Sequence, residues 1–514
     1  MKSPLGAPTG IGVLHFGQCF SSTVLLIHPL PETSEPQGYR LFLGKHREFI
    51  SADEKAEVWI PSERHICWPD SCESAGGVEA LSRFKSMKIS VGLLIYSLLV
   101  LLQASGADIR IVPLTRQSSS LAWTNAFSND VCTVESTPQI GRPWRVEGNY
   151  FTTSSVGQVS IAFSPSNRFY RLLAVDISTN SPQAFGNLVN SYGVLRTIAG
   201  NGFGSVDGSN YWQASFEGGP ATNAALSRPH FAMADNAGNI FIVDKDSHSV
   251  LKVTTNGTIH TVAGTHTPGN TTTASAYGTN VQLNTPNGLW VRGDGTVYVL
   301  DTGNSKVRRL GTNGVMTTLF TDGNGITGGR GLWVRDDEAR AYYCDGPDVK
   351  KWVSGSSPTT INNKGFTDLG NLVVNETNAV VVTDRGASRV YRINSDGSRD
   401  PIAGSGETNA VVDGTLVLTN SLYGVRGIWY LPNRGYLLAL HEGSQILYVD
   451  PSGILHIFVG GVLGAHAGDG EWFHTPGPKI SEARSVSMDA RGNILIVEND
   501  VGYVRMIPFS RLTP

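Results

Sequence analysis

Five polar side chains occupy the same place in repeated phrases of this sequence, each directly before an apolar run that we expect to be a strand. They are His230, Asn287, Arg330, Arg426 and Arg484, and Gly370 holds the place in a further repeat. Three guanidinium groups, an imidazole and an amide, with no carboxylate among them, would make a shared site electropositive. Planar guanidinium groups bind carboxylate, phosphate and sulfate through paired hydrogen bonds. These residue types therefore predict a site for an anionic ligand.

An alternative interpretation gives the three arginines a structural role only. Five repeats end their second apolar run at an acidic residue. Acids such as Asp301, Asp345, Asp384 and Glu498 could each pair with an arginine and lock two repeats together. The acids also have a task of their own, because Asp at the start of a tight turn accepts hydrogen bonds from backbone N–H groups and holds the hairpin. Both interpretations stay open at the level of sequence.

Three tryptophans stand at equivalent places in the runs GLWV, GLWV and GIWY, at Trp290, Trp333 and Trp429. They could stack against sugars, but their equivalence across repeats favours packing between adjacent sheets.

The histidines do not form the pattern of a catalytic zinc site, which needs three converging protein ligands. Only His230 falls at the repeated position. A calcium site would need Glu, Asp and Asn at the starts of the inner runs, and only Asn287 qualifies. GxSxG, HExxH and P-loop motifs are absent after residue 107. We therefore expect no metal, no cofactor and no identifiable catalytic residue.

The elements that must position these residues recur six times. Each repeat holds an apolar inner run, a turn with Gly or Asn, a second run that ends at a polar turn, and a third run. The residues at the polar turn are Asp244, Asp301, Asp345, Asp384, His441 and Glu498, at intervals of 57, 44, 39, 57 and 57 residues. This period, with about four strands per unit, is typical of β-propeller blades rather than a helical solenoid.

The ends of the repeat region predict how the ring closes. The sixth repeat ends near Ile507 with only three strands, whereas the run VLRTIAG at 194–200 stands before the first repeat. Pairing the two segments would complete the last blade and leave no bare sheet edge. We therefore predict an all-β, six-bladed propeller closed by an N-terminal strand. Because inner strands start at one mouth of the central channel, the polar residues described first would line that mouth.

The segment that starts with TIAGNGFGSVDG and continues through GGPATNAALSRPHFAMADNAGNIFIVDKDSHSVLKV resembles an NHL-repeat β-propeller. The phrase GGPATNAAL, followed by a Pro-led inner strand, is specific to that family. The likeness covers roughly residues 193–509, and the third and fifth repeats depart from it at Cys344-Asp345 and His441-Glu442. The resemblance implies a binding platform. Related six-bladed propellers include amidating lyases, lactonases and strictosidine-synthase-like enzymes, so fold similarity alone assigns no activity.

Before the repeats, the phrase MKISVGLLIYSLLVLLQASGAD has the layout of a secretory signal peptide. Because its apolar run at 89–102 is shorter than the roughly 20 residues of a transmembrane helix, a cleaved signal peptide is favoured. A retained membrane anchor is the alternative. We expect a non-native or disordered leader at 1–86, the signal peptide at 87–107, a β-rich accessory segment at 108–192 and the propeller at 193–514. The protein would be secreted.

Features of extracellular proteins follow from that boundary. Cys132 and Cys344 are the cysteines that remain after it, and an oxidising compartment would let them form one disulfide. Three sequons predict N-glycosylation, at Asn256, Asn270 and Asn375. The formal net charge is -3, without a long run of one sign, which argues against a nucleic-acid surface.

These observations favour a secreted, non-catalytic binding or extracellular-matrix protein. Its partners would be extracellular proteins or anionic glycans, with membrane contact only if residues 89–102 stay as an anchor. The alternative is an extracellular propeller hydrolase or lyase acting on a small anionic substrate. There the three arginines would hold the substrate, and His230 would act as general acid or base.

Overall fold

The computed structural model describes residues 109–510 apart from 113–119, 125, 161–167, 180 and 204–205, together with four short strands nearer the N-terminus. These are β1 (Leu14–Gln18), β2 (Ser21–Leu26), β3 (Leu41–Phe42) and β4 (Phe49–Ile50), of which β1 pairs with β2 and β3 with β4. The predicted signal peptide and most of the predicted leader lie outside the described residues. Across the described part of the chain, no helix is long and apolar enough to cross a membrane.

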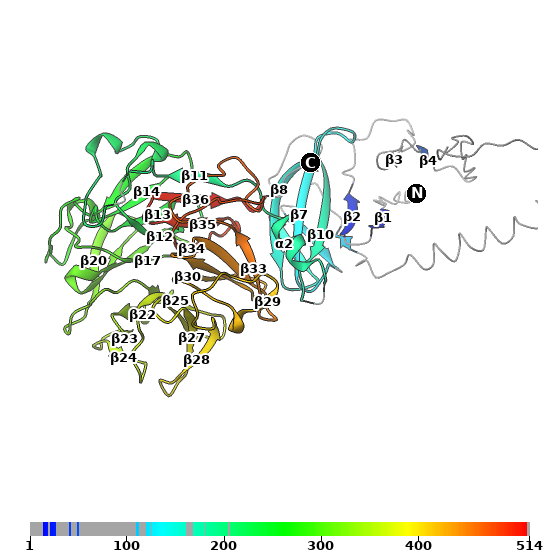
Figure 1. The fold of residues 1–514 in the computed structure, drawn as a ribbon. Coiled ribbons are helices and arrows are strands. Elements are labelled where there is room, and N and C mark those ends of the chain that lie inside the picture. The colour runs from blue at the N-terminus through cyan, green and yellow to red at the C-terminus, as the bar shows by residue number, and fades with distance from the viewer. Residues whose placement is uncertain are drawn as a thin grey trace, which may run out of the picture. The chain divides into compact units, whose positions relative to one another are not determined.

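Six antiparallel sheets follow one another along the chain and stand around a common centre, coloured from green to red in Figure 1. The first blade consists of β12 (Pro229–Ala234), β13 (Ile240–Asp244), β14 (Ser249–Val253) and β15 (Ile259–Ala263). The second consists of β17 (Gly288–Val291), β18 (Val297–Asp301), β19 (Lys306–Leu310) and β20 (Val315–Thr321), with β16 (Ser275–Tyr277) on its outer edge. The third consists of β21 (Leu332–Val334), β22 (Arg340–Asp345), β23 (Asp348–Val353) and β24 (Thr359–Thr360).

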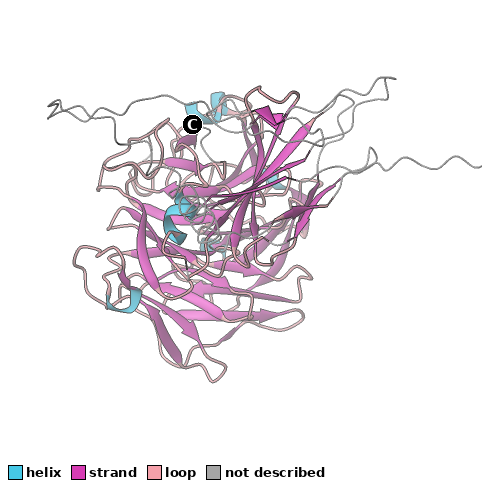
Figure 2. Cartoon of the chain, turned by 90° about the vertical axis from the view of Figure 1, so that its right-hand side faces the viewer, coloured by secondary structure: helices cyan, strands magenta, loops and turns pink. Residues whose placement is uncertain are grey.

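The last three blades repeat this order. The fourth blade consists of β25 (Leu369–Val374), β26 (Val380–Asp384), β27 (Arg389–Ile393) and β28 (Arg399–Ala403). The fifth consists of β30 (Val425–Tyr430), β31 (Tyr436–Leu440), β32 (Gln445–Val449) and β33 (Ile454–Val459), with β29 (Thr415–Leu416) on its outer edge. The sixth consists of β34 (Ala483–Met488), β35 (Ile494–Glu498) and β36 (Tyr503–Ile507), with β11 (Arg196–Ala199) as its fourth strand. Strands dominate the described chain, and its helices are few and short (Figure 2).

The second strand of most blades is an unbroken apolar run because both of its faces are covered. All five residues are buried in β13, β18, β26, β31 and β35. Among the described residues, neighbouring blades pack face to face in shared hydrophobic clusters, and Val131, Ile177 and Leu188 from before the ring join the cluster between the fifth and sixth blades. A lone blade could not bury such runs, so the blades stabilise one another.

The ring closes as the sequence predicted. Strand β11 pairs antiparallel with β36, with Arg196 opposite Met506 and Thr197 opposite Arg505. The six inner strands contact one another in sequence order, and β34 of the last blade contacts β12 of the first. A strand from before the first repeat thus covers the edge that β36 would otherwise leave bare.

The residues before the ring divide between two compact units. One unit contains a three-stranded sheet of β5 (Arg110–Ile111), β6 (Ser120–Thr124) and β9 (Gly157–Ser160). The propeller's unit also takes in 127–133, 146–155 and the chain from 175 onward. The border therefore runs through β7 (Asp130–Thr137), β8 (Arg145–Thr152) and β10 (Phe169–Asp176), and α2 (Ala184–Val189) lies with the propeller. The predicted domain boundary at residue 193 stays a prediction.

The predicted disulfide is wrong, because the structure holds Cys132 and Cys344 as separate buried thiols. Cys344 packs in the cluster between the third and fourth blades, where burial raises the pKa of its thiol to about 12. The Cys132 sulfur accepts a hydrogen bond of 3.5 Å from the Thr152 hydroxyl. Each cysteine fills a place in the packing of its own sheet.

Candidate functional site

The structure brings all six aligned positions to one small cavity at a mouth of the central channel. Its lining consists of His230, Phe231, Asn287, Arg330, Gly370, Asn371, Arg426 and Arg484. Its solvent-accessible volume is about 10 Å³. A volume of this size holds about one water molecule. The predicted ring therefore exists as a group of neighbours, and it encloses a much narrower space than an organic ligand needs.

Close approach of the inner strands explains why the cavity is narrow. A Cβ atom on Gly370 would lie 2.4 Å from the Thr383 hydroxyl and 2.6 Å from the Arg426 carbonyl oxygen. That hydroxyl donates a hydrogen bond of 2.7 Å to the same carbonyl and so ties the fourth blade to the fifth. The absence of a side chain at position 370 thus has a packing reason and brings Arg426 near the axis.

The three ring arginines differ in how their charge is balanced. Arg330 donates to Asp368 at 2.6 Å and to the Leu369 carbonyl at 3.0 Å. Arg484 donates to the Asn499 side-chain oxygen at 3.0 Å. By contrast, the Nε and Nη1 atoms of Arg426 have no hydrogen-bond partner among the described residues, and neither has Nδ1 of His230. Both side chains are buried, at 6% and 5% exposure.

Burial and mutual repulsion disfavour the charged forms of these groups. Burial, assisted by the positive charges of Arg330 and Arg385, lowers the pKa of Arg426 to about 10. Burial and Arg426 hold the pKa of Arg484 well below its usual value. Burial and Arg484 similarly depress the pKa of His230, so its imidazole is neutral at pH 7.

None of the ring arginines pairs with the turn acids in the described part of the chain, contrary to the structural alternative. Asp301 pairs with Arg308 at 3.0 Å and Glu498 with Arg505 at 2.8 Å, each pair being fully enclosed. Asp345 lies 3.7 Å from Lys350. Because each turn acid has a partner on its own blade or accepts only backbone hydrogen bonds, it does not reach the ring.

The predicted role of these acids as acceptors for backbone N–H groups is confirmed, but most of the N–H groups differ from those expected. They belong to the loop that leads into the inner strand. The donors are Ser227 to Asp244 at 2.9 Å, Asn284 to Asp301 at 2.8 Å, Thr327 to Asp345 at 2.7 Å, Thr367 to Asp384 at 3.0 Å, and Ser481 to Glu498 at 3.1 Å. Each acid therefore fixes where its inner strand begins and so positions one member of the ring.

The tryptophans do more than fill the space between adjacent sheets. Trp290 of the second blade lies 6.2 Å from Trp333 of the third and 6.2 Å from Trp429 of the fifth, measured between ring centroids. Since the second and fifth blades are not neighbours, their rings meet across the channel. Each ring sits three residues beyond a mouth residue, roughly 10 Å along the strand. The tryptophans, which are partly buried, therefore narrow the channel beyond the cavity.

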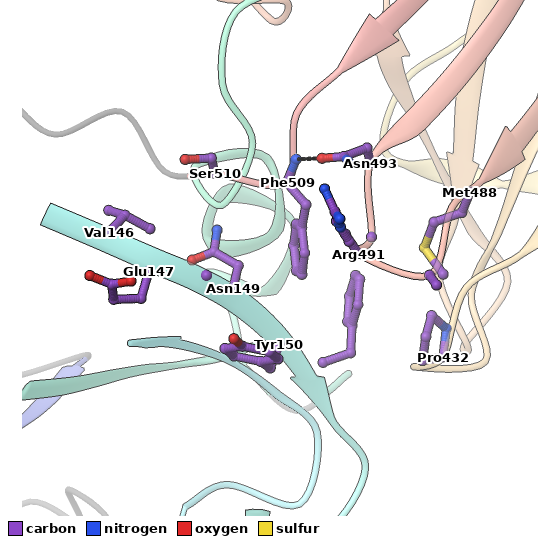
Figure 3. A pocket seen from close by; sticks show the side chains of 14 residues that line it. Val146, Glu147, Asn149, Tyr150, Pro432, Met488, Arg491, Asn493, Phe509 and Ser510 are labelled. Atoms are coloured by element: carbon purple, nitrogen blue, oxygen red, sulfur yellow. Dashed lines mark hydrogen bonds between the residues drawn. The ribbon is translucent and has the colours of Figure 1, made fainter. Parts of the chain in front are cut away.

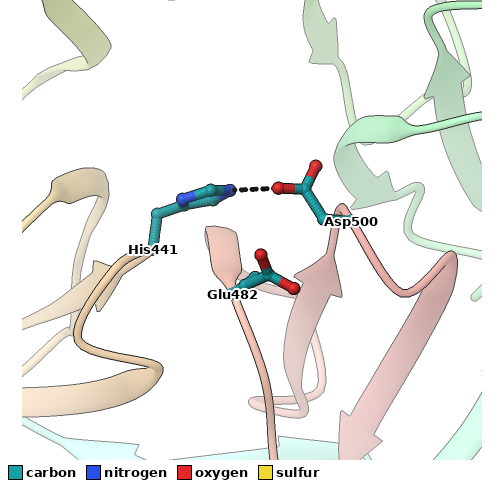
Figure 4. A group of neighbouring side chains, drawn as sticks. All are labelled: His441, Glu482 and Asp500. Atoms are coloured by element: carbon teal, nitrogen blue, oxygen red, sulfur yellow. Dashed lines mark ion pairs between the residues drawn. The ribbon is translucent and has the colours of Figure 1, made fainter. Parts of the chain in front are cut away.

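The sequence analysis missed a second group beside the mouth, formed by His441, Glu482 and Asp500 (Figure 4). One atom from each lies within 4.8 Å of the others, and the His441 Nε2 atom is 3.2 Å from Asp500 Oδ2. Burial alone would raise the pKa of Asp500, yet His441 and Arg228 hold it below its usual value. The available signal was His441, which is the only marker residue without a carboxylate.

This group has the donor atoms of a divalent-cation site, an imidazole and two carboxylates. However, Arg228 already donates to Asp500 at 2.6 Å, and Arg484 adds a second positive charge nearby. Those charges oppose cation binding.

A larger hollow of about 630 Å³ lies in the propeller's unit, lined by residues 146–151 and the turn between β34 and β35 (Figure 3). Phe151 stacks on Phe509 with ring centroids 4.6 Å apart, and the Phe509 N–H donates to the Asn493 side chain at 2.8 Å. Glu147 and Arg491 are its charged lining residues. It does not combine several cationic side chains as the mouth does.

The three sequons lie in loops and turns. Asn256 and Asn270 are exposed, whereas Asn375 is half-buried. The Asn375 side-chain oxygen accepts from the backbone of Thr377 and Ala379, and that of Asn270 accepts from Lys306 at 2.6 Å. Glycosylation stays a prediction.

Comparisons with known proteins agree on the fold. A family model for the Teneurin NHL domain matches residues 213–311. A structure of a protein of unknown function from Bacteroides thetaiotaomicron is 14% identical with a TM-score of 0.51, covering 78% of this chain and 98% of that one. An auxiliary nutrient binding protein from the same organism is 13% identical with a TM-score of 0.46, covering 78% and 97%.

A virginiamycin B lyase from Staphylococcus aureus is 13% identical with a TM-score of 0.37, covering 55% of this chain and 94% of that one. No curated protein sequence matches the chain. The likeness to the structure with a TM-score of 0.51 supports the fold, and at 14% identity it transfers no activity.

Proposed function

Since residues 196–507 form an NHL-type β-propeller, we propose that the protein is a non-catalytic binding protein that recognises an anionic group at its channel mouth. A binding role suits the architecture, because the mouth gathers side chains from six separate blades on a rigid frame. The proposed ligand is a glycan or protein that presents a carboxylate or sulfate.

The observation that supports this proposal is the pair of buried hydrogen-bond donors on Arg426 that have no acceptor among the described residues. Its Nε and Nη1 atoms lack partners although the side chain is buried. Buried donors without acceptors destabilise the folded state, and an anion that accepts these hydrogen bonds removes that cost. Arg330, Arg484 and His230 surround the same cavity and add donors.

The hydrolase or lyase alternative gains no support from the mouth. His230 would have to reach a substrate, but its side chain is buried behind a space of about 10 Å³. An anionic group can place one oxygen there, whereas a reacting bond between larger groups cannot lie beside the imidazole.

An extracellular location belongs to the same proposal. Its support is the signal-like phrase at 87–107 and the exposure of Asn256 and Asn270. Mass analysis of the protein released from expressing cells tests it. An N-terminus near residue 108 with added glycan mass is expected, and retention of 89–102 would contradict secretion.

The ligand test uses an array of carboxylated and sulfated glycans, followed by calorimetry with the strongest binder. Arg426→Ala should weaken binding about 30-fold or more, roughly 2 kcal/mol, because a buried charged contact is lost. The control is Arg392→Ala, which removes a half-exposed arginine paired with Asp400 at 2.7 Å on an outer strand. Equal affinities for the two variants, or turnover of the glycan, would contradict the proposal.

A further inference from the structure

We propose that the cavity at the channel mouth is a halide site, occupied by one chloride ion whenever no ligand group fills it. The inference rests on the proposed function, because the ligand's anionic group would have to displace this ion. It adds the identity of the resting occupant and makes chloride a competitor of the ligand.

The size of the cavity selects a single small particle. A space of about 10 Å³ for the centre of a water-sized sphere admits one water or one ion of similar radius. Whole carboxylate, phosphate or sulfate groups exceed it, although one oxygen of such a group fits. Beyond the cavity, the Trp290 and Trp429 rings meet across the channel with centroids 6.2 Å apart and narrow the way deeper.

The unused hydrogen-bond donors point to an anion. Nε and Nη1 of Arg426 and Nδ1 of His230 are buried atoms without partners, on side chains that line the cavity. With hydrogen on Nδ1 of the neutral His230 ring, all three are donors. The Asn287 side-chain oxygen is also unpartnered, and turning this amide about its last torsion would present its NH₂ group instead.

The balance of charge favours a halide over a water molecule. Asp368 and Asn499 accept hydrogen bonds from Arg330 and Arg484, whereas Arg426 interacts with the nearby carboxylates of Glu442 and Asp368 only through space and keeps two donors without acceptors. A water molecule accepts two hydrogen bonds and carries no net charge, whereas chloride accepts several and neutralises one guanidinium. A bound anion would also offset the repulsion that disfavours the charged forms of Arg426 and Arg484.

Two measurements on the whole protein test the inference. Crystals grown in sodium bromide should show an anomalous difference peak beside Arg426. In thermal unfolding at constant ionic strength, chloride replaces hexafluorophosphate, an anion that is too large for the cavity and has no carboxylate or sulfate. Each tenfold rise in chloride above its Kd should stabilise wild type by about 1.4 kcal/mol. For a propeller of about 320 residues this corresponds to roughly 2 °C in Tm.

The matched variants are Arg426→Gln, which removes the guanidinium with the unpartnered donors, and Arg392→Gln in β27, where the arginine pairs with Asp400. The chloride dependence of Tm should be lost in the first and kept in the second. No bromide peak in wild type, or equal chloride dependence in the two variants, would overturn the inference. The bromide experiment decides even if Arg426→Gln fails to fold.

A further comparison separates this inference from the proposed function. Ligand affinity that falls as chloride replaces hexafluorophosphate supports both proposals. Ligand binding that ignores chloride overturns the halide site alone, and a bromide peak in a protein that binds no anionic ligand supports the halide site while refuting the proposed function.

Discussion

Removing the carboxylate of Asp384 tests the idea that turn acids position the ring. This side chain is fully buried and accepts backbone hydrogen bonds from Thr367 at 3.0 Å, Asp368 at 2.9 Å and Ala387 at 3.3 Å. Asp368 in turn pairs with Arg330 at 2.6 Å. The chain of contacts therefore runs from a buried turn to the channel mouth.

The cost follows from the contacts that are lost. Hydrogen bonds to a charged group contribute about 1.5–3 kcal/mol each, so losing the two shorter ones gives about 4 kcal/mol for Asp384→Ala. Unfolding entropy of about 2.1 cal/mol/K per residue over about 320 residues converts this to a fall of roughly 6 °C in Tm. Asp384→Asn keeps one acceptor oxygen and should lose about half as much.

Differential scanning calorimetry measures these shifts, with Asp396→Ala as the control. Asp396 lies in an exposed turn of the same blade, where its contacts are to Ser398. Its replacement should change Tm by no more than about 1 °C. The reasoning is refuted if Asp384→Ala matches this control, or if the alanine and asparagine variants lose the same stability.

Two further changes probe closure and pH. Thr197→Pro disturbs the pairing of β11 with β36, so the exposed edge of β36 should cause self-association that light scattering detects. The control, Thr415→Pro in the outer strand β29, should stay monomeric. A monomeric Thr197→Pro protein would argue against closure of the ring by β11. Burial lowers the pKa of His266 from 6.5 to about 4 against the opposing pull of Glu217. The unfolded chain then binds more protons between these values, so wild type should lose stability as pH falls from 6.5 to 4. Urea unfolding should show a smaller loss in His266→Gln, and equal losses would count against this assignment.

Local chemistry explains why so much of the fold could be predicted. Apolar runs cut by turn residues specify strands, and their recurrence specifies blades, because each rule acts over a few residues. Alignment of the repeats also identified His230, Asn287 and the ring arginines, since equivalent places in equivalent blades meet at one mouth. The unpaired run near Thr197 was sufficient to predict the closing strand.

Ring closure decided what the repeats could not show, because it brings together residues from blades that are distant in the chain. Trp290 meets Trp429 across the channel, and His441 meets Asp500 although neither position alone suggests a partner. Sequence counting allowed a disulfide between Cys132 and Cys344, whereas the structure buries the two thiols without joining them.

The width of the mouth and the balance of its charges likewise depend on tertiary structure. Residue types predicted an electropositive ring, whereas only the packed strands show that Arg330 is paired, that Arg426 is not, and that the cavity admits about one water-sized particle. The physical reason is that charge compensation and cavity volume depend on distances of a few ångströms between blades, and these distances are set by how all six sheets pack.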